Sequence, residues 1–308
     1  MISQKTKNKI KNNIVGYLLL TPFLIGLIFF VVYPLALALF NSFFLNYVPR
    51  RAGKYDWSTF GIGNYTQAFQ DPIVWKSLLN TLIYSVVMVP LTLAIGFAIA
   101  YVLSKDFAGA KIFRVLYYLS CIIPGIVTAM IYSYMYDSES FGFFNQILIK
   151  LGLKESGFFD DESHFVAMVS YMSISLFCLA GGMPFWIAGF KSIPDGVIEA
   201  ARLEGASGLT LVFKIIVPMM SKYIIYQLIC GIIGVFQIGQ GVLQLTKTAG
   251  YNSNLMFLGL YIYNQTQGAE GFNFGYGSAL GFILFVIIAG LTALTFKFNK
   301  FIYYEADD

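Results

Sequence analysis

The amino-acid sequence predicts an all-α, polytopic membrane protein that forms a single transmembrane domain over residues 1–308. Three observations predict this class. The chain is 57% hydrophobic and only 12% charged, and its mean hydropathy is +0.70, which is too apolar for an ordinary soluble protein. Several uncharged runs reach the length of about 20 residues that a membrane helix needs. The charged residues lie between these runs, where loops are expected.

The uncharged runs predict six transmembrane helices. The predicted spans are residues 14–40, 78–104, 115–136, 165–190, 212–239 and 276–296. Four lysines precede the first span, as in a signal peptide. The apolar run is too long for that role and no small-residue cleavage site follows it, so we expect an anchor. Pro22 and Pro34 predict bends in this helix or mark its limits.

Lysine and arginine counts predict the orientation of the six spans. The segments on the side of both termini carry 13 of these residues, whereas the segments on the other side carry 7. Cytoplasmic segments carry the excess of lysine and arginine. We therefore expect both termini and the loop between the fourth and fifth spans to face the cytoplasm.

Two longer connections are expected on the outer side. Residues 137–164 are polar and mainly acidic, with a short helix predicted over Asn145–Leu151. In the segment 247–275, the apolar stretch Leu255–Tyr263 has only nine residues and cannot cross a membrane. We therefore interpret it as an interfacial or re-entrant segment.

The charged loop between the fourth and fifth spans predicts two helices joined by a glycine turn. The first helix is expected over residues 194–205, because Pro suits its first turn and Asp195 suits the positive end of its dipole. Gly205 stands where the helix must end, and Ser207 can cap a second helix that starts with Leu209. The first helix is amphipathic. Its apolar face consists of Pro194, Val197, Ile198 and Ala201, and its polar face of Asp195, Glu199 and Arg202.

Three interpretations of this loop were weighed. A helix–turn–helix that binds DNA needs an aqueous core and a basic recognition face, and this stretch has neither, so no nucleic-acid partner is expected. An ordinary helical loop remains an alternative. The third interpretation is a docking element for another protein.

The loop resembles the EAA signature of bacterial ABC importer permeases. The matching residues are Glu199-Ala200-Ala201, Gly205 after three residues, Ile215 after nine more, and Val217-Pro218. The family usually has Leu at the position of Val217. Weaker matches to the carbohydrate, maltose-type branch include Gly63-Asn64-Tyr65 and Asn80-Thr81-Leu82. A departure is Thr248–Tyr251, where relatives often have a Gly-Gly-Pro turn.

The resemblance implies a type I ABC importer permease fold, a cell-membrane location and a heteromeric complex. It implies that residues 194–205 are a coupling helix in the groove of a separate ATPase subunit. The implied partners are a second permease subunit, an ATPase dimer, an extracytoplasmic solute-binding protein, membrane lipid and a carbohydrate, expected as an oligosaccharide. The residues implied in ATPase coupling are Glu199, Ala200, Ala201, Arg202, Gly205, Ile215 and Pro218.

Polar side chains inside the spans suggest a solute path. Charged residues are nearly absent there, which disfavours a proton relay. Amides and tyrosines suit a neutral, hydroxyl-rich ligand, but the same residues can serve helix packing, and both alternatives stay open. The candidates are Asn80, Tyr84, Tyr132, Tyr171, Ser175, Gln237, Gln240 and Gln244.

The remaining reactive residues predict no enzyme. The sequence has no phosphate-binding G-x-x-x-x-G-K-[ST] loop, so ATP and Mg are expected on the partner ATPase and no cofactor on this chain. Cys121, Cys178 and Cys230 lie in apolar runs and are expected to be buried. His164 has no fixed partner in the sequence and is expected at the surface without a role.

The alternative functions are import of glycerol phosphate or another small solute, an ATP-independent secondary carrier, and a membrane scaffold.

Overall fold

The computed structural model describes residues 4–49, 55–105, 107–177, 182–238, 240–246, 248–267 and 273–302. Within these ranges, the side chains of residues 4–15, 120–121, 177, 240, 243–244 and 298–302 are not described. The chain forms two compact units. The first consists of the residues up to Gln70 with Gln265–Phe282, and the second of Asp71–Asn264 with the residues from Ile283 onward.

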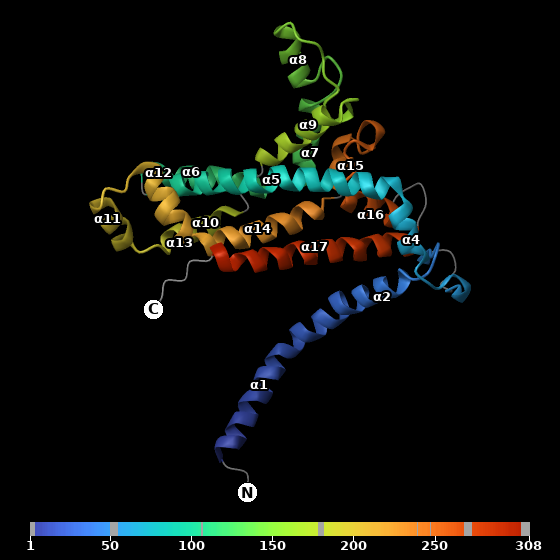
Figure 1. The fold of residues 1–308 in the computed structure, drawn as a ribbon, viewed down its shortest axis with the longest axis horizontal. Coiled ribbons are helices and arrows are strands. Elements are labelled where there is room, and N and C mark those ends of the chain that lie inside the picture. The colour runs from blue at the N-terminus through green and yellow to red at the C-terminus, as the bar shows by residue number, and fades with distance from the viewer. Residues whose placement is uncertain are drawn as a thin grey trace. The chain divides into compact units, whose positions relative to one another are not determined.

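The described residues are almost entirely helical. The α-helices are α1 (Gln4–Leu27), α2 (Tyr33–Asn41), α4 (Gly63–Gln70), α5 (Pro72–Ser104), α6 (Ala110–Ile122), α7 (Gly125–Met135), α8 (Phe143–Lys150), α9 (His164–Phe177), α10 (Met183–Lys191), α11 (Asp195–Leu203), α12 (Gly208–Leu211), α13 (Val217–Met219), α14 (Ser221–Phe236), α15 (Gln240–Thr246), α16 (Leu258–Gln267) and α17 (Phe274–Ile302). Figure 1 shows their arrangement. The short 3₁₀ segments are η2 (Trp57–Thr59), η3 (Phe158–Asp160) and η6 (Tyr251–Ser253), and the π-helical segments are η1 (Ile28–Val32) and η5 (Val212–Ile216).

Three continuous helices are long and apolar enough to cross a membrane: Gly16–Asn41, Pro72–Ser104 and Phe274–Lys297. A fourth crossing is possible if the bent pair Gly208–Met219 and Ser221–Phe236 counts as one span. The described residues therefore match the first, second and last predicted spans, and the six crossings are not confirmed.

The other predicted spans are interrupted. In the third, Pro124 separates α6 from α7, since the residue before a proline is driven to an extended conformation, and Ile123 has φ −66° and ψ 123°. The fourth consists of α9 and α10, and residues 178–181 between them lie outside the described ranges. The fifth was predicted as one helix from residue 212, but the chain bends by 73° around Met220, so the straight helix begins at Ser221.

Both π-helical segments end two residues before a proline. Segment η1 precedes Pro34, and η5 precedes Pro218. Proline lacks an N–H and its ring crowds the carbonyl of the residue four positions earlier, so a wider turn relieves the clash. The predicted distortion at Pro34 is thus a π turn within an otherwise continuous helical path.

Helix α5 organises the second unit. Its start is fixed by the Asp71 carboxylate, which accepts a hydrogen bond from the Ile73 N–H at 2.8 Å and one from the Tyr261 hydroxyl at 2.6 Å. Helices α10 and α14 run beside α5 (Figure 1). Helices α10 and α14 come close at Gly189, where an added Cβ would lie 2.6 Å from Met220 Cε.

In the first unit, Asn64 holds the turn that follows α2. Its buried amide donates hydrogen bonds to the Ser42 carbonyl at 2.8 Å and to the Phe44 carbonyl at 2.9 Å. Aromatic rings pack around this turn, among them Tyr47 and Tyr55, which stack with their centroids 4.8 Å apart. The loop that follows the first span is therefore ordered by its own hydrogen bonds and aromatic contacts.

The apolar stretch Leu255–Tyr263 is packed inside the protein. Leu255, Phe257, Leu258 and Leu260 are fully buried, and the stretch leads into helix α16. The sequence predicted an interfacial or re-entrant segment. These side chains are buried against α5 and its neighbours, which disfavours an exposed interfacial position, and the re-entrant alternative stays a prediction. The expected buried cysteines also differ, since Cys230 is exposed. The side chains of Cys121 and Cys178 lie outside the described part of the chain.

Candidate functional site

The predicted docking helix is present as α11, which lies beyond one end of α5 (Figure 1). Pro194 has extended backbone angles and immediately precedes it, so the helix begins at Asp195. Asp195 lies in the first turn and Arg202 in the last turn, the arrangement that the helix dipole favours.

The end of α11 is a Schellman motif centred on Gly205. The Gly205 N–H donates to the Arg202 carbonyl at 3.0 Å, and the Ala206 N–H donates to the Ala201 carbonyl at 2.9 Å. Gly205 has φ +88°, in the left-handed region that side-chain-bearing residues avoid. The space in which its Cβ would lie is open to 4 Å. The backbone conformation thus favours glycine at this position, which is exposed.

The second helix of the loop starts one residue earlier than predicted, at Gly208. Ser207 occupies the capping position, but its hydroxyl makes no capping bond, and its carbonyl instead accepts from the Thr210 N–H at 3.1 Å. Ile215 and Pro218 are half-buried on the segment that follows, and Ile216 between them is buried. These motif residues support the base of the loop.

One face of α11 anchors the loop to the membrane helices. Ile198 and Ala201 pack against a buried cluster, whereas Pro194 and Val197, expected on the same apolar face, are exposed. The cluster consists of Ala100, Leu103, Met183, Trp186, Leu211, Ile216 and Met220. It joins α5, α10 and the segment Gly208–Met219 at one place.

The opposite face of α11 is available to a partner. Glu199 and Ala200 are exposed there, and Leu203 has 90% of its surface exposed, whereas the exposed Arg202 lies on the side that faces the ends of α5 and α10. Helix α11 thus presents an exposed face with Glu199, Ala200 and Leu203, while Ile198 and Ala201 on its other face contact the buried cluster.

Asn80, a candidate for the solute path, forms hydrogen bonds with other segments of the same chain. It is only 2% exposed, and its amide nitrogen donates to the Asn254 carbonyl at 3.1 Å and the Met256 carbonyl at 3.0 Å. Its amide oxygen lies 2.9 Å from His164 Nε2, which must be the donor because the oxygen can only accept. Asn80 therefore ties α5 to α9 and to the stretch before α16.

Tyr84, Tyr171 and Ser175 also contact one another. The Tyr84 hydroxyl is hydrogen-bonded to the Ser175 hydroxyl. The Tyr84 and Tyr171 ring centroids are 5.6 Å apart, and both rings pack against Phe257. Of the two alternatives left open for these residues, the contacts support helix packing.

The remaining path candidates are Tyr132, Gln237 and two residues of α15. Tyr132 is half-buried on α7. Gln237 is exposed at the end of α14 and lines a cavity of about 450 Å³ with α17 residues that include Phe285 and Thr292. The side chains of Gln240 and Gln244 lie outside the described part of the chain.

Sequence reasoning missed the role of His164. This residue was expected at the surface without a role, but it is half-buried and binds Asn80. Because 84 positions separate the two residues, the sequence around either of them could not predict this hydrogen bond. Among the described residues, no group of three or more His, Cys, Asp or Glu side chains could hold a metal ion.

Comparisons with known proteins agree with this geometry. Residues 91–302 match the family model described as binding-protein-dependent transport system inner membrane component. The match includes the whole of α11, the Schellman turn and the segment up to Pro218.

Two relatives align with this chain over nearly the whole length of both sequences. The probable ABC transporter permease protein YesP of Bacillus subtilis (strain 168) is 28% identical over 310 residues, which cover 99% of this chain and 97% of the relative. The lactose transport system permease protein LacF of Rhizobium radiobacter is 25% identical over 285 residues, which cover 91% and 92% respectively.

A solved structure shares the fold. It is the crystal structure of a bacterial alginate ABC transporter in complex with an alginate pentasaccharide-bound periplasmic protein. One of its chains superposes with a TM-score of 0.79 at 18% identity, and the superposition covers 97% of this chain and 99% of that chain.

Proposed function

Because the chain belongs to the family of binding-protein-dependent transport system inner membrane components, we propose that it is one permease subunit of an ATP-driven importer for a carbohydrate. The observation that carries the proposal is the loop Asp195–Pro218, whose helix α11 is anchored on one face and exposed on the other. The name of the lactose permease LacF supports a sugar as the solute. The near absence of charged residues from the predicted spans, in which Lys214 and Lys222 lie near the start of the fifth, fits a neutral solute.

The proposal includes the topology. The chain crosses the membrane six times, with α6–α7 and α9–α10 as interrupted crossings. Both termini and α11 lie on the cytoplasmic side, which the count of 13 against 7 lysine and arginine residues supports. This orientation brings Glu199 and Gly205 within reach of a cytoplasmic ATPase.

The proposal also includes the partners. A second permease subunit completes the path, two ATPase subunits bind ATP and Mg, and an extracytoplasmic protein delivers the solute. Glu199, Ala200 and the Gly205 turn form the contact with one ATPase, and Arg202 borders this contact on the side of α5 and α10. Ala201, Ile215 and Pro218 couple the contact to the base of the loop. ATPase closure moves α11, and the buried cluster around Trp186 carries that movement into α5 and α10.

Reconstitution tests the proposed function. The tagged chain is expected to co-purify with a second permease and an ATPase, and the assembly in vesicles is expected to import sugar only with ATP on the ATPase side. Uptake that follows an ion gradient without ATP would instead identify a secondary carrier. Uptake of glycerol phosphate in preference to sugars would keep the importer and overturn the substrate class, whereas an assembly without transport would identify a scaffold.

Gln237→Ala is expected to raise the half-saturation concentration for uptake about fivefold, because the loss of one hydrogen bond is worth about 1 kcal/mol. The residue is exposed on the cavity formed with α17, so assembly should be unaffected. Uptake kinetics in vesicles measure the effect. Cys230→Ala is the matched control, because Cys230 is exposed two turns earlier on the same helix. Equal kinetics for both variants would remove Gln237 from the path.

A further inference from the structure

A basic cavity lies beside α11, on the side of the loop that faces the membrane helices. Its volume is about 590 Å³. Three cationic side chains, Lys105, Lys191 and Arg202, line it together with a single carboxylate, Asp195. The floor is provided by apolar residues that include Phe190 and Ile216. The cavity therefore combines an excess of positive charge with an apolar base.

The three cations have no anionic partner among the described residues. No ion pair within 4 Å joins Lys105, Lys191 or Arg202 to Asp195 or to another carboxylate in the part of the chain that the structure describes. Lys105 Nζ lies 4.2 Å from the centroid of the Tyr101 ring, whose face attracts the ammonium group but carries no net negative charge. An anion in the cavity would supply the missing charge.

The position of the cavity along the helices indicates the source of that anion. Lys105 immediately follows helix α5, and Lys191 is the last residue of α10. The two helices end side by side, since the Phe190 ring lies 5.0 Å from Phe97 and 5.6 Å from Tyr101. The ends of apolar membrane helices lie at the depth of the lipid headgroups, and tyrosine is enriched there.

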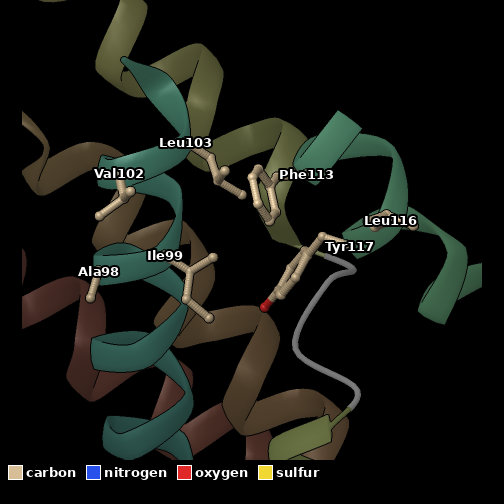
Figure 2. A pocket seen from close by; sticks show the side chains of 7 residues that line it. All are labelled: Ala98, Ile99, Val102, Leu103, Phe113, Leu116 and Tyr117. Atoms are coloured by element: carbon tan, nitrogen blue, oxygen red, sulfur yellow. The ribbon is translucent and has the colours of Figure 1, made fainter. Parts of the chain in front are cut away.

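An apolar groove reaches the same end of α5. It has a volume of about 640 Å³, and Figure 2 shows Leu103 and Phe113 facing each other across it, from α5 and α6. Val102 also lines the groove and stands one helical turn before Lys105. The groove supplies surface for an acyl chain within one turn of the basic cavity.

We propose that the cavity formed by Lys105, Lys191 and Arg202 binds the phosphate-bearing headgroup of an anionic phospholipid from the leaflet that surrounds the loop. Basic cavities between membrane helices bind headgroups of this kind, whereas a water-soluble anion has no need of a site at headgroup depth. The bound headgroup holds α11 against the ends of α5 and α10 through one shared anion. The inference concerns the lipid alone and does not depend on which solute is transported.

Lipid retention measures the site directly. The assembled importer is purified from nanodiscs of phosphatidylcholine with one-fifth phosphatidylglycerol, and the phosphatidylglycerol that stays bound is quantified by native mass spectrometry. Lys105→Gln and Lys191→Gln are each expected to weaken retention about fivefold, and the double variant about 25-fold, since one lysine near an anionic headgroup is worth about that factor. Lys111→Gln, an exposed lysine outside the cavity, is the matched control.

Three further arms make the result decisive. The double arginine variant, which keeps both charges, is expected to retain the lipid, and its retention shows that a fall in the glutamine variants is not a folding defect. Retention by the glutamine variants equal to that of Lys111→Gln would overturn the site. Displacement of phosphatidylglycerol by millimolar inorganic phosphate would show that the cavity takes a free anion and would overturn the lipid as its occupant. If phosphatidylglycerol is retained only after the ATPase subunits are removed, the ATPase covers the cavity in the assembled importer, and the lipid is overturned as its occupant.

Discussion

Gly205→Trp is expected to lower ATP-driven uptake by about 100-fold while the assembly still reaches the membrane. Overpacking a fitted contact costs about 1–3 kcal/mol, and a tryptophan at the tip of the loop would hold the proposed ATPase surface away from α11. The chain itself has room for the side chain, because the space around the Cβ position is open to 4 Å. Uptake and solute-stimulated ATP hydrolysis in reconstituted vesicles measure the effect.

Two substitutions at the same position separate bulk from backbone strain. Gly205→Ala carries the strain of a left-handed residue, about 1–2 kcal/mol, without the bulk. Gly205→Asn carries less strain, because asparagine tolerates this conformation. We expect both to retain most of the uptake. Normal solute-stimulated hydrolysis in Gly205→Trp would rule out α11 as the coupling element, and equal loss in all three variants would assign the effect to the Schellman turn alone.

Asn80→Ala is expected to lower the free energy of unfolding by about 3–9 kcal/mol, because two buried groups and one half-buried group lose their hydrogen-bond partner at about 1–3 kcal/mol each. These groups are the carbonyls of Asn254 and Met256 and the Nε2–H of His164. Thermal unfolding of the detergent-solubilised assembly should show the change. The half-saturation concentration for the solute should remain near that of the wild type in whatever fraction stays folded.

Two controls define the Asn80 prediction. Leu79→Ala removes an exposed side chain from the preceding position on α5 and should change stability little. Asn80→Asp keeps the oxygen that His164 binds but loses the two amide donors, so an intermediate loss is expected. If Asn80→Ala unfolds like Leu79→Ala and instead weakens solute binding, Asn80 belongs to the transport path and the internal contacts do not govern its role.

The loop was predictable from sequence because its determinants are local. Pro194, Asp195 and Gly205 each act on backbone within one or two turns, and the structure has the helix and its left-handed end at these positions. Glycine at a helix end has one common use, so the turn could be predicted without knowledge of its surroundings. The same local reasoning failed at Ser207, where a backbone carbonyl replaces the expected hydroxyl cap.

Contacts between distant segments were not predictable. Asn80 reads as a polar residue in an apolar helix, and nothing in the sequence places Asn254 and His164 beside it. Burial of Leu255–Tyr263 depends in the same way on side chains from other helices. The bend around Met220 was missed because the apolar run continues through it, and hydropathy does not report the direction of a helix axis.

That bend determines how a push on the loop reaches the membrane. The segment Gly208–Met219 meets helix α14 at 73°, with Met220 fully buried at the corner. Since this angle is close to a right angle, the larger component of any thrust along the first segment is directed across the axis of α14. An ATPase that pulls the loop would thus tilt α14 sideways at its Ser221 end. This tilt would widen or narrow the space between α14 and its neighbouring helices without moving any residue along the membrane normal.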